Sequence, residues 1–89
     1  MKSVFTEEYE YFLQTLISAR KSADITQQEL AKSLNKPQSF VSKYERRERR
    51  LDVVEFVIIA RTIGFDPCTI IKEIESRLHS HQPSAGGGQ

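Results

Sequence analysis

Residues 26–45 read Thr-Gln-Gln-Glu-Leu-Ala-Lys-Ser-Leu-Asn-Lys-Pro-Gln-Ser-Phe-Val-Ser-Lys-Tyr-Glu, and this stretch decides the fold. Thr26 followed three residues later by Glu29 forms a capping box, in which each side chain bonds the other residue's amide. A helix is therefore predicted to begin after Thr26. Asn35 tolerates the left-handed conformation common at helix ends, and Pro37 suits the first turn of the next helix.

Two short helices joined by so tight a turn must cross steeply, which predicts a helix-turn-helix. The second helix, expected from Pro37 to about Arg46, has an apolar side with Val41 and Tyr44. Its other side carries short or hydrogen-bonding residues: Gln38, Ser39, Ser42 and Lys43. A helix that binds only protein would carry aromatic or aliphatic anchors there instead. This side is therefore the candidate nucleic-acid contact.

The segments Thr26-Gln27-Gln28-Glu29-Leu30-Ala31 and Val41-Ser42-Lys43-Tyr44-Glu45-Arg46 resemble the Cro/C1-type (XRE) helix-turn-helix domain of phage and bacterial repressors. The resemblance covers most of residues 8–66. Two positions depart from the family pattern. Asn35 replaces a usual Gly, a mild change because both accept positive φ. Arg47 stands where a Gly often ends the second helix, so that helix either runs longer here or ends under strain.

Three more helices are expected around the pair. Thr6 can cap a first helix ending near Ala23, and Asp52 with Glu55 forms a second capping box. The helix after Asp52 is apolar around most of its girth, and central burial is expected for Val54, Val57, Ala60 and Ile63. Asp66-Pro67 starts the last helix. We predict an all-α, compact five-helix bundle of the lambda-repressor-like type over residues 1–79, and a disordered tail over residues 80–89.

Charge is concentrated on and just after the second helix of the pair. Residues 36–50 hold six basic and two acidic residues, a balance of +4, whereas the whole chain of 89 residues carries +1. A solvated charge run is the simpler interpretation, but the adjoining motif favours contact with phosphates. The single cysteine, Cys68, fits a reducing cytoplasm. Neither a signal peptide nor a membrane-spanning run is recognisable, so a cytoplasmic protein without membrane contact is expected.

The resemblance implies binding of double-stranded DNA as a homodimer on a palindromic operator, most simply as a transcriptional repressor. Gln38 is the first candidate for base readout, because its amide can hold adenine N6 and N7 together, and Ser39, Ser42 and Lys43 share its face. Gln27 matches the residue that anchors a phosphate in the family. The further phosphate candidates are Lys36, Arg46, Arg49 and Arg50.

Two further sets of residues are expected to be structural. Arg20 lies on the apolar side of the first helix and, as in relatives of this fold, is expected to pair with Glu45 rather than to extend into solvent. Surplus apolar residues predict a dimer interface at Ile58, Ile70, Ile71, Ile74 and Leu78. Part of the fifth-helix stripe must cover the domain's own core, so only its outer edge with Ile58 is expected to face the second subunit. The alternative is that Ile58 is simply an exposed apolar residue.

The sequence gives little support for a catalytic or a metal-binding function. His79 and His81 lack further ligands nearby in sequence, and Cys68 lacks a neighbouring His or second Cys. No catalytic triad or phosphate loop can be assembled, so an enzyme is not expected and no cofactor or metal is implied. The alternative function is a protein-interaction module, such as an antitoxin or sensor-coupled regulator, that uses its apolar fourth and fifth helices.

Overall fold

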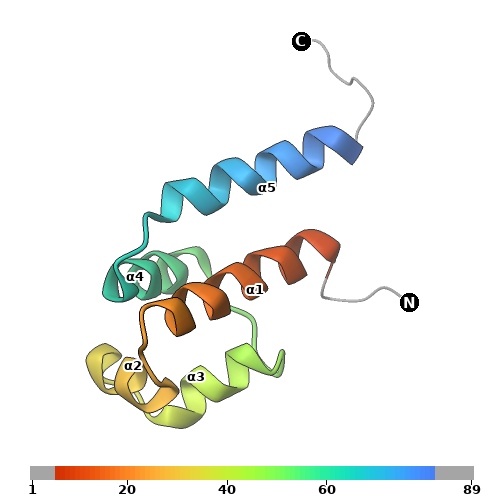
Figure 1. The fold of residues 1–89 in the computed structure, drawn as a ribbon. Helices are drawn as coiled ribbons and strands as arrows, with labels where there is room; N and C mark the ends of the chain where they lie inside the picture. Colours follow the sequence, from red (N-terminus) through yellow and green to blue (C-terminus); the bar gives the residue numbers. More distant parts are fainter. Residues whose placement is uncertain (1–5, 82–89) are drawn as a thin grey trace.

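The computed structural model describes residues 6–81, which fold into five helices (Figure 1). They are α1 (Glu7–Ser22), α2 (Gln27–Leu34), α3 (Gln38–Glu45), α4 (Val53–Ile63) and α5 (Pro67–His81). The predicted all-α class and the helix-turn-helix, formed by α2 and α3, are confirmed. Within residues 6–81, none of the helices combines the length and apolar character needed to cross a membrane.

Side-chain caps fix where four of the helices begin, and at α5 the Asp66 carboxylate accepts from the Cys68 amide at 3.0 Å. The Thr6 hydroxyl accepts from the Tyr9 amide at 3.1 Å. At α2, Thr26 accepts from the Glu29 amide at 3.0 Å, and Glu29 accepts from the Thr26 amide at 2.9 Å. Asp52 and Glu55 make the same reciprocal pair at α4, at 2.7 and 3.0 Å. Both predicted capping boxes are therefore present.

Left-handed residues end the first four helices. The φ angles are 62° at Asp24, 60° at Asn35, 69° at Arg47 and 95° at Gly64. At each end the following amide reaches back to a carbonyl in the last helical turn; after α3, the Glu48 amide bonds the Lys43 carbonyl at 2.8 Å. Of the two outcomes expected for Arg47, the structure shows the strained end, because α3 stops at Glu45 and Arg47 is left-handed without being glycine.

The core is formed by apolar side chains from all five helices, with α1 lying between α5 on one side and the α2–α3 pair on the other (Figure 1). The Phe12 and Phe56 rings meet edge to face at 5.1 Å between centroids. The buried apolar residues are Phe12, Leu13, Leu16, Leu30, Ala31, Val41, Tyr44, Phe56, Ile59, Ala60 and Ile70. This core holds α3 through Val41 and Tyr44.

The buried face of α4 differs from the predicted one. Val54 and Val57 were expected inside, but they are 62% and 38% exposed. Ala60 is buried as expected and Ile63 is partly buried, whereas the rest of the inner face is Phe56 and Ile59. The prediction was wrong because helical spacing cannot choose a face when most of the girth is apolar. The Phe56 ring, which fills the space beside Phe12, decides the orientation.

The last helix continues past the boundary expected from the sequence. The predicted domain ended at residue 79, but α5 includes Ser80 and His81. The remainder of the tail predicted to be disordered, residues 82–89, lies outside the described part of the chain.

Candidate nucleic-acid interface

The two sides of α3 have opposite character. Val41, Tyr44 and Glu45 are buried on the side facing the domain, and burial raises the pKa of the Tyr44 phenol, which keeps it neutral. On the other side Gln38, Ser39 and Lys43 are exposed and Ser42 is half-buried, its hydroxyl donating to the Ser39 carbonyl at 3.4 Å. The four candidate base-reading residues therefore lie on the outer side of the second helix of the motif.

Gln27 connects this outer side to the buried side. Its amide nitrogen donates to Glu45 Oε1 at 2.8 Å. Its amide oxygen accepts a long hydrogen bond, 3.5 Å, from the Gln38 amide nitrogen. The residue expected to anchor a phosphate thus contacts the first candidate for base readout. Helical spacing alone does not reveal this contact between residues of two different helices.

A nearly buried ion pair lies behind Gln27. Arg20 Nε donates to Glu45 Oε2 at 2.8 Å and Nη2 donates to Oε1 at 3.0 Å. The two side chains are 9% and 6% exposed. Arg20 Nη1 also donates to the Ile25 carbonyl at 2.7 Å, so the guanidinium ties α1 to α3 and to the segment before α2. Each charge has a close opposite charge, as burial requires.

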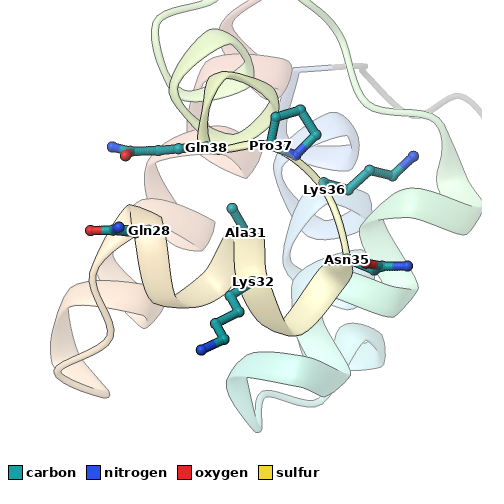
Figure 2. A pocket seen from close by; sticks show the side chains of 7 residues that line it. All are labelled: Gln28, Ala31, Lys32, Asn35, Lys36, Pro37 and Gln38. Carbon is teal, nitrogen blue, oxygen red and sulfur yellow. The ribbon is translucent and has the colours of Figure 1, made fainter.

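A shallow groove of about 440 Å³ runs between α2 and α3 (Figure 2). The Gln28 and Gln38 side chains project on the same side of it, from different helices, while Lys36 points the other way (Figure 2). Lys32 is exposed on α2 and lines the same groove. Sequence reasoning did not select Gln28 or Lys32, because only the crossing of the two helices brings them beside Gln38.

Acidic partners hold most of the arginines that follow α3. Arg46 makes a two-point pair with Glu48, at 3.0 and 3.1 Å. Arg47 Nε pairs with Glu10 of α1 at 2.8 Å. Each arginine holds the pKa of its carboxyl partner below the ordinary value, so both acids are charged at neutral pH. Glu48 is already included in the balance of +4 for residues 36–50, so of these two pairs only the one with Glu10 lowers the net charge around this segment.

Arg49 and Arg50 each lie against an aromatic ring. The Arg49 guanidinium is 4.8 Å from the Phe40 ring centre and bonds Glu55 at 2.7 and 3.0 Å. This contact, followed by the bond from the Asp52 amide, lowers the pKa of Glu55. The Arg50 guanidinium lies 4.2 Å from the Tyr9 ring centre. Lys36 Nζ is 5.3 Å from the Phe40 ring, so that ring is near two cations.

The residues predicted for a dimer interface do not form one exposed patch. Ile58, Ile71 and Leu78 are 50%, 48% and 39% exposed, and Ile74 is half-buried. Ile70 is fully buried in its own core, so it is not available to a second subunit and that assignment is wrong. Leu78 lies near the C-terminal end of α5. That end of the helix extends away from α4 (Figure 1).

The exposed apolar residues of α4 form a continuous strip. Val53, Val54, Val57 and Ile58 follow the spacing of one helix face and are all exposed. We call these four residues the α4 apolar face. Sequence reasoning assigned Val54 and Val57 to the core and selected only Ile58 for the surface.

Comparison with known proteins agrees with this geometry. A family model described as helix-turn-helix matches residues 16–70. A solved structure of an XRE-family like protein from Pseudomonas syringae pv. tomato str. DC3000 is 50% identical, with a TM-score of 0.76. The match covers 79% of this chain and 85% of that one. A comparison with curated proteins found no match. The chain therefore belongs to the XRE family of helix-turn-helix proteins and has the fold of a DNA-binding transcription regulator.

Proposed function

We propose that the protein binds a palindromic double-stranded DNA operator as a homodimer and represses transcription. The N-terminal part of α3 enters the major groove, with Gln38 contacting a base and Ser39, Ser42 and Lys43 alongside it. Lys36, Arg46 and Arg50 provide charge for phosphates on either side of the groove. Lys32 adds to them from the neighbouring helix.

One observation supports this proposal above the others. The outer side of α3 exposes donors and acceptors at Gln38, Ser39 and Lys43, while its inner side is fixed by core packing and the Arg20–Glu45 pair. Base readout needs a rigid element whose exposed side chains can bond base edges. Gln38 also makes a long hydrogen bond, 3.5 Å, to Gln27.

The test begins with random-sequence duplex DNA. Binding should weaken as salt rises, because contacts with phosphates release counterions, and selection from a random library should then recover a two-fold symmetric site. A selected population with no shared sequence would contradict base readout by α3. Binding that does not depend on salt would contradict phosphate contact.

For the dimer, we propose that the α4 apolar face meets the same face of a second copy. Val53, Val54, Val57 and Ile58 present adjoining apolar surface, and a patch that meets itself satisfies two-fold symmetry. A single domain spans only a few base pairs, so two domains about 34 Å apart, one turn of DNA, are needed to specify a site.

The same face favours a second candidate function, a module that binds a different protein. Exposed apolar strips of this kind also receive partner helices. The two candidate functions predict different association states in solution, because a homodimer buries the α4 apolar face without needing a different protein. A monomer at micromolar concentration that fails to select a palindrome would favour the protein-interaction module.

A further inference from the structure

Arg49 and Arg50 adjoin in sequence, but the structure engages them differently. Arg49 Nη1 donates both to Glu55 Oε1 at 3.0 Å and to the Arg50 carbonyl at 2.9 Å, and Nη2 donates to Glu55 Oε2 at 2.7 Å. Its guanidinium also contacts the Phe40 ring. Three of its five N–H donors are thus committed within the protein. Arg49 joins α3, the loop after it and the start of α4.

Arg50 is held from the other side by α1. Its guanidinium lies over the Tyr9 ring at 4.2 Å, and Arg50 is exposed. The Tyr9 hydroxyl accepts from the amide of the next residue, Leu51, at 3.2 Å. The Arg50 backbone is therefore fixed between the Arg49 guanidinium and the Tyr9 hydroxyl, while the Tyr9 ring supports its side chain.

We propose that Tyr9 and Arg49 are positioning residues that present Arg50 to a DNA phosphate, and that Arg49 is not itself a phosphate ligand. This inference rests on the proposed DNA-binding function. It assigns different roles to Arg49 and Arg50, although the two side chains carry the same charge. A cation–π contact attracts a guanidinium through the ring face and does not itself use the N–H donors with which arginine binds a phosphate.

The physical benefit is preorganisation. An arginine side chain loses much rotamer freedom when it is fixed on a phosphate, and a side chain already resting on a ring loses less. An exposed contact of this kind corresponds to roughly a two- to fivefold change in affinity. Removing the ring should thus weaken binding to selected and random DNA alike, because phosphate contacts carry no sequence information.

The experiment measures DNA affinity as a function of salt concentration for the full chain and its variants. Thermal melts confirm that each protein is folded at the titration temperature. Arg50→Ala should flatten the dependence of log affinity on log salt by about 0.9 for each bound subunit. Tyr9→Leu should weaken binding about two- to fivefold for each bound subunit, and this loss should vanish in the Arg50→Ala background. Tyr9→Phe, which keeps the ring, should stay within about twofold of the parent.

Tyr11→Leu is the matched control. Tyr11 also lies on α1 with an arginine, Arg77, over its ring at 4.3 Å, but that arginine belongs to α5. Tyr11→Leu should leave DNA affinity unchanged. If Tyr9→Leu is unfolded, Tyr9→Met, with a flexible side chain that fills irregular gaps, replaces it.

The outcomes separate this inference from the proposed function. If the parent does not bind DNA, the proposed function fails and the inference fails with it. If the parent binds DNA but Tyr9→Leu has the same affinity as the parent, only the inference fails. The same holds if Tyr9→Leu weakens binding by the same factor in the parent and in the Arg50→Ala background. A further flattening of about 0.9 for each bound subunit on adding Arg49→Ala to Arg50→Ala would show that Arg49 is a phosphate ligand, which also overturns the inference.

Discussion

Gln38 is the residue on which the proposed base readout depends most. Its side chain is exposed at the start of α3 and contacts Gln27. Gln38→Ala should cost roughly 1–3 kcal/mol for each half of the selected site and relax the preference at one base pair in each half, because each subunit loses a bidentate contact with adenine. Competition binding with selected and random duplexes measures both effects.

The control is Gln14→Ala, which shortens an exposed glutamine on α1, outside the candidate interface. It should change neither affinity nor preference. An equal loss of affinity by Gln38→Ala on selected and random DNA would show that α3 does not read bases through this residue.

Arg47 carries a backbone cost that glycine would avoid. Its φ is 69°, a conformation that costs an ordinary residue roughly 1–2 kcal/mol. Arg47→Ala and Arg47→Gly both lose the pair with Glu10, but only glycine relieves the strain. Glycine also adds freedom to the unfolded chain, which offsets about 0.4–1 kcal/mol. Arg47→Gly should therefore exceed Arg47→Ala in unfolding free energy by about 0.5–1 kcal/mol. Urea melts of the two variants compare them directly, and equal midpoints would contradict the strain.

Among the elements, α1 and α3 are joined by the Arg20–Glu45 pair. Loss of either partner leaves a nearly buried charge uncompensated, so Arg20→Leu or Glu45→Leu should each cost about 3–5 kcal/mol. The double variant should recover a large part of that loss. Recovery should be incomplete, because the Ile25 carbonyl and the Gln27 amide nitrogen also lose a partner.

Thermal or urea melts of the two single variants and the double variant form the cycle that tests this pair. Losses that simply add would mean that the two residues do not interact energetically. The stability cycle is independent of DNA, so its result holds whatever the operator is.

For the whole molecule, the prediction is self-association through the α4 apolar face. Ile58→Glu places a charge within the proposed contact, where a second copy would have to desolvate it, so this variant should sediment as a monomer at a concentration at which the parent is a dimer. Gln14→Glu adds the same charge on α1 and should leave the dimer intact. A parent that sediments as a monomer, or an Ile58→Glu variant that still dimerises, would rule out this interface.

The sequence by itself determined where α2 and α4 start and stop. Thr26 with Glu29 and Asp52 with Glu55 act over three residues, and Asn35 and Gly64 act on their own backbone, so these signals are local and can be read from the chain. The exposed side of α3 was predictable for the same reason, because helical periodicity separates Val41 and Tyr44 from the polar residues.

Only the tertiary structure decided which face of α4 is buried and which cations are already paired. A helix that is apolar around most of its girth can bury any of several faces. In α4 the packing of Phe56 on Phe12 decided which face is buried. Arg47 and Glu10 lie 37 residues apart, and Tyr9 and Leu51 lie 42 apart. Such contacts depend on how the helices cross, and no local pattern encodes that. The bundle therefore sets the positions of the arginines proposed to meet DNA.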